Sequence, residues 1–183
     1  MLFTHDTELN LSFLQALANT VPESSESGSD ELAGTRHLDA FLDEWTFNLP
    51  RPCTAAELDA VKRVRADVRA IWGAEELDVV AWINRILIDA RATPQLVNHD
   101  GLGWHVHATD TDAPLAERIV VEAAMTLIDV IRAERLDRLR DCEADDCDGL
   151  LVDLSKNGSK RFCSTRCGNR MAVRAYRARS ASA

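Results

Sequence analysis

The sequence CEADDCDGLLVDLSKNGSKRFCSTRC, residues 142–167, holds two cysteines at each end of a 15-residue spacer. Four residues separate Cys142 from Cys147, and three separate Cys163 from Cys167. Two such short pairs with roughly 15–20 residues between them are typical of a tetrahedral zinc site, because each pair supplies two thiolates from one turn. The spacing therefore predicts one zinc ion held by all four cysteines.

Four thiolates fill a tetrahedral coordination shell and leave no position for water or substrate, so the predicted zinc is structural. Metal binding would supply much of the folding free energy of so small a module. Removing the zinc should melt residues 142–170 and leave the helical domain largely intact. Packing or oxidation of the cysteines is the alternative, which the regular spacing disfavours.

The spacer predicts a hairpin, and the residues after it predict a helix. Residues 150–154 are apolar and strand-like, Asn157-Gly158 is a turn signal, and residues 161–163 can return as the second strand. Ser164 can cap a helix that carries Cys167 in its first turn. The turn that carries Cys142 and Cys147, called the knuckle, together with the hairpin and the helix makes a treble-clef-like zinc module.

The chain before the first of these cysteines predicts a mostly helical domain. Apolar residues recur at helical spacing in residues 9–20, 37–47, 54–72, 76–91 and 115–140. A capping box of the form Thr54-x-x-Glu57 opens the third helix, and Asp112 with Pro114 is expected to open the last one.

Two connections in this domain are also predicted. Two short strands flank His99-Asp-Gly, and Asp100-Gly101 predicts a two-residue hairpin turn between them. Residues 22–34 are rich in Ser, Gly and Glu with nothing to bury, which predicts a flexible surface loop.

These patterns predict a mainly α (α+β) fold in two parts. Residues 1–138 form a helical N-terminal domain with a small β-hairpin, and residues 139–183 form the zinc module with a basic C-terminal helix. A hydrophobic fraction of 46% suits a globular chain. No run approaches about 18 apolar residues, and the first residues lack the regions of a signal peptide. We therefore expect a cytoplasmic protein that does not enter a membrane.

Charge divides the chain at residue 153. The net charge is −9, but all 30 acidic residues lie at or before Asp153, together with 13 basic ones, so this part carries −17. The last 30 residues hold eight basic residues and no acidic one, which gives +8. Such asymmetry is typical of a separate interaction surface on the basic part.

Four of the arginines after Cys163 gather on one side of the predicted helix. At about 100° per residue, Arg166, Arg170, Arg174 and Arg177 fall within about 80° of one another. Like charges at i, i+4 destabilise an isolated helix, which favours an anionic partner. Arginine forks suit phosphates and guanine edges, so DNA is the expected partner. The candidate DNA-binding residues are Lys156, Lys160, Arg161, Arg166, Arg170, Arg174 and Arg177.

Three alternatives for this basic helix stay open. It could be a solvated tail, it could dock on the chain's own acidic domain, or it could bind a protein or another anion. In the last case the chain would be an interaction adaptor whose zinc finger recognises an acidic partner.

Several segments together resemble the CGNR zinc finger family. They are Cys142-Glu-Ala-Asp-Asp-Cys147, Leu154-Ser-Lys-Asn-Gly158, Arg161-Phe-Cys-Ser164, the literal Cys167-Gly-Asn-Arg170, and Arg174-Ala-Tyr-Arg-Ala-Arg179. In that family the finger follows a helical ABATE domain. The upstream chain resembles this domain in Ala18-Asn-Thr20, in the helix that ends at Trp45, and in the hairpin before the last long helix.

The resemblance implies a bacterial, stress-linked transcription regulator whose CGNR module binds DNA. It maps Cys142, Cys147, Cys163 and Cys167 onto the zinc ligands. Because a monomer offers only one short arginine helix, a homodimer that reads paired half-sites is a further expectation.

Other features of the sequence point less clearly to a function. His105 and His107 alternate on a predicted strand with His99 nearby, but exposed strand histidines are commoner than metal ligands. We expect Trp45, Trp72 and Trp82 in the core. A pocket between the helices that senses a small effector remains an open alternative. No catalytic motif is visible, so we do not expect an enzyme.

Overall fold

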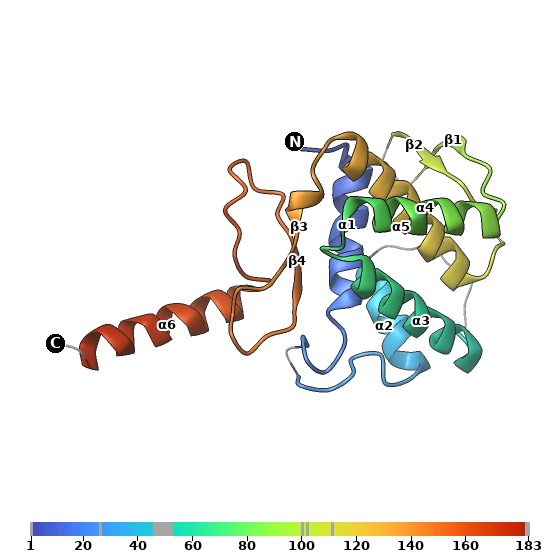
Figure 1. The fold of residues 1–183 in the computed structure, drawn as a ribbon. Coiled ribbons are helices and arrows are strands. Elements are labelled where there is room, and N and C mark those ends of the chain that lie inside the picture. Colours follow the sequence, from blue (N-terminus) through green and yellow to red (C-terminus); the bar gives the residue numbers. More distant parts are fainter. Residues whose placement is uncertain are drawn as a thin grey trace.

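The computed structural model of the chain describes residues 2–25, 27–45, 53–99, 101, 103–110 and 112–181. These residues form six α-helices and two antiparallel hairpins, which confirms the predicted fold class (Figure 1). In chain order the elements are α1 (His5–Ala18), α2 (Thr35–Glu44), α3 (Ala55–Ile71), α4 (Glu76–Asp89), β1 (Gln95–Asn98), β2 (Trp104–His107), α5 (Leu115–Arg132), a short 3₁₀ turn (Leu136–Arg138), β3 (Leu139–Asp141), β4 (Leu150–Val152) and α6 (Thr165–Ala181). No helix among them is both long and apolar enough to cross a lipid bilayer.

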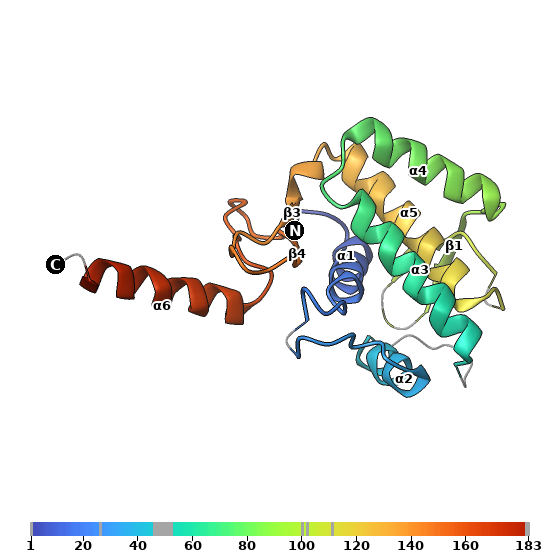
Figure 2. The same ribbon diagram turned by 60° about the horizontal axis from the view of Figure 1, so that its bottom comes forward.

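Helix α5 is the centre of the helical part and contacts α1, α3 and α4 (Figures 1 and 2). Its buried residues lie on more than one side, as expected of a core helix that is apolar nearly all round. Trp72 and Trp82 are buried in the same core, and Trp45 packs against it, as the sequence predicts.

The last core helix is shorter than its pattern suggests. It ends at Arg132, because Glu134 adopts a left-handed conformation with φ of 55°. The Arg135 amide then donates to the Val130 carbonyl (3.0 Å), which closes the helix with a Schellman-type cap. The prediction of a helix to about residue 140 is wrong, and the 3₁₀ turn and β3 occupy the remainder.

The predicted caps and turns have mixed outcomes. The capping box at Thr54 and Glu57 is confirmed, with both reciprocal hydrogen bonds present. The prediction that Asp112 caps the last core helix is wrong, since Pro114 takes the N-cap position of α5. The two-residue turn is also wrong, because Asn98 pairs with Trp104 and so five residues connect β1 to β2. The predicted helix end at residues 49–52 lies outside the described residues.

The Ser-rich stretch at 22–34 is non-helical where described, but it does bury side chains. Leu32 is fully buried, so the prediction that nothing there is buried is wrong. The Asp30 carboxylate accepts a hydrogen bond from Arg65 (2.7 Å), which together with Lys62 holds the pKa of Asp30 well below its usual range. These contacts fasten the stretch to α3.

Candidate metal centre and basic helix

The four cysteines of the two pairs come together at one point. Cys142 and Cys147 lie in the knuckle between β3 and β4, while Cys163 and Cys167 lie just before and within the first turn of α6. All four sulfur atoms lie within 4.8 Å of one another, with Sγ–Sγ distances of 3.6 Å for Cys147–Cys163 and 3.7 Å for Cys163–Cys167. A tetrahedral zinc with Zn–S bonds near 2.3 Å places its sulfur ligands about 3.8 Å apart. The site therefore fits one structural zinc.

Burial and hydrogen bonding set the electrostatics of these thiols. Burial raises the pKa of Cys163 and of Cys147. Burial also acts to raise the pKa of Cys167, but hydrogen bonds with Ser164 and the neighbouring thiols lower it overall. Because buried thiolates are costly without a counter-charge, a divalent cation is the group that these residues suit.

Glycine at position 149 lets the chain pass close to the sulfur cluster. A Cβ there would lie 2.7 Å from Cys163 Sγ and 3.0 Å from Cys147 Sγ. The Gly149 amide also donates to Cys147 Sγ (3.3 Å). Any side chain at this position would displace the sulfur atoms, so the position requires glycine.

The strand that pairs with β4 is not the expected one. Strand β4 pairs with β3, with Arg140 opposite Leu151, so the prediction that residues 161–163 form the second strand is wrong. Residues 161–163 instead meet the knuckle, where the Glu143 amide donates to the Arg161 carbonyl (2.9 Å).

A buried aspartate holds the loop between β4 and the second cysteine pair. The Asp153 side chain is fully buried and accepts hydrogen bonds from Arg140, from the Lys160 amide (2.9 Å) and from the Ser155 amide (2.9 Å). Burial acts to raise the pKa of Asp153, but these bonds and the Arg140 charge outweigh it, so the pKa is lowered. The predicted turn at Gly158, with φ of 62°, lies in this loop.

Side chains of α1 and of its C-cap residue, Asn19, hold the other edge of β4, a role that sequence reasoning missed. The Asn19 amide group donates to the Leu150 carbonyl and accepts from the Leu150 amide, both at 2.8 Å. Gln15 accepts from the Val152 amide (2.7 Å). The only signal in the sequence was the Ala18-Asn-Thr20 segment of the family resemblance, which carried no role for Asn19.

Replacing Asn19 with Ala should lower the free energy of unfolding by about 1–3 kcal/mol, because two hydrogen bonds to the partly buried edge of β4 are lost. Urea denaturation of wild type and Asn19→Ala measures this difference. Asn157→Ala, at an exposed turn position, is the matched control and should change stability little. Equal stability of Asn19→Ala and wild type would show that these bonds contribute nothing.

Helix α6 leaves the zinc module and projects away from the helical part (Figures 1 and 2). Ser164 caps it as predicted, since the Cys167 amide donates to Ser164 Oγ (3.2 Å). Residues 172–180 are all exposed, including Val173 (48%) and Tyr176 (65%). Met171 packs against the cysteine cluster, and beyond it the described residues of the helix are exposed on every side.

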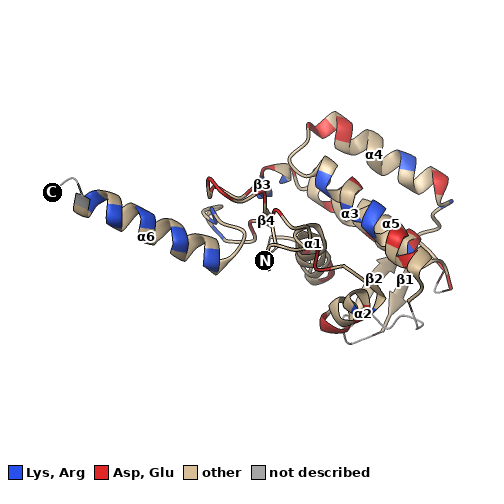
Figure 3. Cartoon of the chain, turned by 90° about the horizontal axis from the view of Figure 1, so that it is seen from below, with Lys and Arg blue, Asp and Glu red and all other residues tan. Residues whose placement is uncertain are grey.

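Basic residues follow one another along α6 without an acidic one, while acidic residues mark α2, α4 and α5 (Figure 3). Two of the arginines share one partner in the knuckle, since Arg170 and Arg174 lie 2.8 and 2.6 Å from the Asp146 carboxylate. Desolvation acts to raise the pKa of Asp146, but the Arg174 hydrogen bond and the two positive charges lower it overall.

The other candidate DNA-binding residues differ in their surroundings. Arg161 pairs with Glu143 (2.6 Å), and the Lys160 ammonium donates to the Val152 carbonyl (3.2 Å). Arg166 is exposed at the start of α6. Lys156 and Arg177 are exposed and make no ion pair with any described residue.

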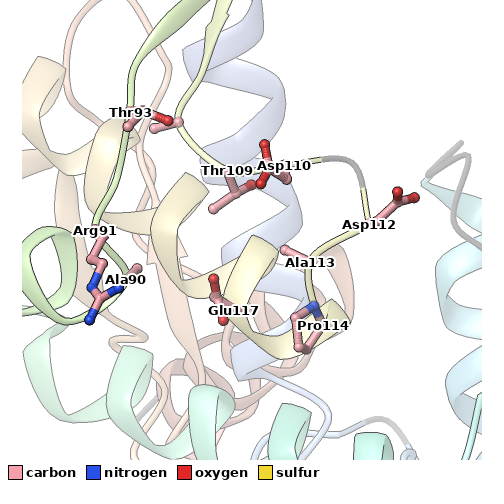
Figure 4. A pocket seen from close by; sticks show the side chains of 10 residues that line it. Ala90, Arg91, Thr93, Thr109, Asp110, Asp112, Ala113, Pro114 and Glu117 are labelled. Carbon is pink, nitrogen blue, oxygen red and sulfur yellow. The ribbon is translucent and has the colours of Figure 1, made fainter.

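Two features of the helical part bear on the remaining sequence predictions. The three histidines do come together, but His105 is buried and so is not an exposed strand histidine. A hollow of about 310 Å³ lies between the end of α4 and the start of α5, where Figure 4 shows Arg91, Asp110 and Glu117 among its lining residues. Its lining is mostly polar, whereas small-molecule pockets are typically lined by apolar side chains.

Comparison with known proteins places both parts of the chain. Residues 138–180 match the model of the CGNR zinc finger, and residues 12–134 match the ABATE model, described as "Putative stress-induced transcription regulator". A search of curated proteins finds no match to the chain. The ABATE model covers more than half of the chain, and the finger follows it in the expected order. The chain therefore belongs to the ABATE family and carries a CGNR zinc finger after its ABATE region.

Proposed function

We propose that this regulator binds DNA through its zinc-held basic helix. In this proposal residues 139–183 form the DNA-binding module, and residues 1–138 form the helical domain that carries it. Cys142, Cys147, Cys163 and Cys167 are the zinc ligands. The protein acts in the bacterial cytoplasm without catalysing a reaction.

The observation that carries the proposal is the exposed, acid-free stretch of α6. A helix with exposed residues from 172 to 180 fits the major groove, which admits one α-helix. Phosphate contacts from arginine and lysine would supply most of the affinity. Lys156 and Arg177 are the residues best placed for this, because no described carboxylate neutralises them.

The Asp146 carboxylate in the knuckle is expected to affect how strongly α6 binds DNA. Asp146 holds Arg170 and Arg174 at the base of α6, so a phosphate must compete with this carboxylate for both guanidinium groups. The interaction also fixes the direction in which the helix leaves the finger. Asp146 is thus an internal competitor for the same anion-binding groups.

Two substitutions should move DNA affinity in opposite directions. Arg177→Ala should weaken binding of duplex DNA about 3- to 10-fold, because one phosphate contact is lost. Asp146→Asn should strengthen it about 2- to 10-fold, because two arginines are released from exposed ion pairs. Fluorescence anisotropy titrations with a labelled duplex at constant salt measure both.

The matched control for net charge is Arg85→Ala, which removes an exposed arginine from α4, on the helical part. It should leave affinity nearly unchanged. Equal weakening by Arg85→Ala and Arg177→Ala would contradict a localised DNA surface. The adaptor alternative predicts that the chain binds an acidic protein and shows no affinity for duplex DNA at low salt. That pair of results would favour the adaptor alternative over DNA binding. The small effector and the homodimer stay predictions.

A further inference from the structure

Three histidine rings meet beside the β1–β2 hairpin. His105 and His107 lie on one face of β2 because side chains alternate along a strand, and His99 follows the end of β1. The Nε2 atom of His107 lies 3.0 Å from Nε2 of His99 and 3.2 Å from Nε2 of His105. One nitrogen from each ring lies within 4.8 Å of the other two. Three potential metal ligands therefore converge on one point.

The second nitrogen of two of these rings faces an oxygen acceptor. Nδ1 of His105 lies 2.9 Å from the Gly103 carbonyl, and Nδ1 of His107 lies 2.5 Å from the Glu122 carboxylate on α5. A carbonyl or carboxylate oxygen can only accept, so each Nδ1 carries a proton and each neutral ring keeps a lone pair on Nε2. These two lone pairs then face each other across 3.2 Å, and a cation between them removes the repulsion.

The spacing and the outer contacts suit a metal ion in particular. Zn–N bonds of 2.0–2.1 Å in tetrahedral geometry place the nitrogen ligands about 3.3 Å apart, close to the two Nε2–Nε2 distances. Histidines that ligate metals commonly donate their other ring N–H to a carboxylate or a carbonyl, as His107 and His105 do here. Imidazole suits zinc, copper and nickel among the first-row metals.

We propose that His99, His105 and His107 form a second metal site, separate from the cysteine cluster, that binds a divalent first-row transition metal ion such as zinc. Glu122 acts as a positioning residue by holding the His107 ring. Three protein ligands leave a coordination position for water or a small oxygen or nitrogen donor, and the exposed His99 makes the site reachable from solvent.

The ion would also fasten the hairpin to the core. Strands β1 and β2 have four residues each, and their outer face exposes Leu96 (63%) and Trp104 (70%). A two-stranded hairpin of this size is marginally stable alone. A metal that joins His99 to β2, with Glu122 holding His107 from α5, would connect both ends of the hairpin loop to the central helix.

Zinc stoichiometry of the full-length chain tests the proposal. After equilibration with zinc and dialysis, elemental analysis should give two zinc ions per wild-type chain. The double variant His99→Ala/His107→Ala should retain one, and Cys163→Ser should lose the ion of the cysteine site while keeping the histidine one. His37→Ala, an exposed histidine on α2, is the matched control and should retain two. One zinc per wild-type chain, or two in the double variant, would overturn the proposal.

The positioning role of Glu122 can be tested through the zinc affinity of the histidine site, with all three histidine ligands still present. Glu122→Gln should weaken zinc binding at the histidine site roughly 10-fold, with two ions restored at higher zinc. Competition with a chromophoric chelator measures this affinity, and circular dichroism reports whether the helices remain folded. Unchanged zinc affinity in both Glu122→Gln and His99→Ala would overturn the proposal. None of these outcomes depends on whether α6 binds DNA.

Discussion

Removing zinc from the cysteine site is expected to unfold the knuckle and α6 while helices α1 to α5 remain folded. Structural zinc supplies about 10–16 kcal/mol of binding free energy in zinc-finger peptides, and this energy is folding energy for a module with little core of its own. The buried residues around the site are few, namely Cys142, Ala144 and Cys167. Hydrogen exchange measured by mass spectrometry, with and without a chelator, should show the loss of protection.

The loss should be confined to residues 142–148 and 161–181. Residues 149–160 should stay ordered, unlike in the sequence prediction for residues 142–170. Strand β4 keeps its partners without zinc, because Leu150 and Val152 belong to the main core and α1 binds the outer edge of the strand. Asp153 should likewise keep the following loop ordered. Cys53→Ser, outside the cluster, is the control and should retain zinc. Loss of protection throughout α1 to α5, or none in α6, would contradict this account.

Replacing Asp153 with Asn should destabilise the chain by about 3 kcal/mol, or roughly 6–12 °C in the unfolding midpoint. The Asp153 carboxylate is fully buried, but Arg140 is about one third exposed. The expected loss of unfolding free energy is therefore at the lower end of the losses known for removing one partner of a buried ion pair. Asn also presents an N–H₂ group to the donors that the carboxylate accepts from. Thermal unfolding followed by circular dichroism measures the shift.

The same substitution has a signed pH dependence. The pKa of Asp153 is lowered in the folded chain, so its stabilisation is present above the unfolded pKa of about 3.9 and is lost as pH falls through the folded pKa. The stability difference between wild type and Asp153→Asn should therefore be full at pH 7 and shrink below about pH 4. Asp67→Asn, at an exposed position on α3, is the control. A difference that does not change with pH would exclude the charged form as its cause.

Sequence patterns predicted the features of this fold that depend on neighbours along the chain. Helical spacing located five helices before the finger, and the capping box at Thr54 formed as expected. The cysteine spacing located the metal site, because two short pairs are constrained by local chain geometry. The end of the last core helix escaped prediction, since a Glu at the left-handed position of its cap is an uncommon signal.

Partners far apart in the sequence were beyond these patterns. The edge of β4 is held by Asn19, which lies 131 residues away from Leu150. Strand β3 could not be distinguished from the end of a helix by periodicity, so β4 was assigned the wrong partner. The histidine cluster depends on Glu122, a residue on another element whose role no spacing rule links to the hairpin.

The zinc-loaded module is proposed to bind DNA through its basic helix. The most direct measurement is the affinity of the full chain for duplex DNA at 50 and 200 mM salt. With about four to six phosphate contacts and a log–log slope near 0.9 per contact, affinity should fall about 10²- to 10³-fold between these concentrations. Absence of measurable binding at the lower salt, or binding that does not change with salt, would contradict the account.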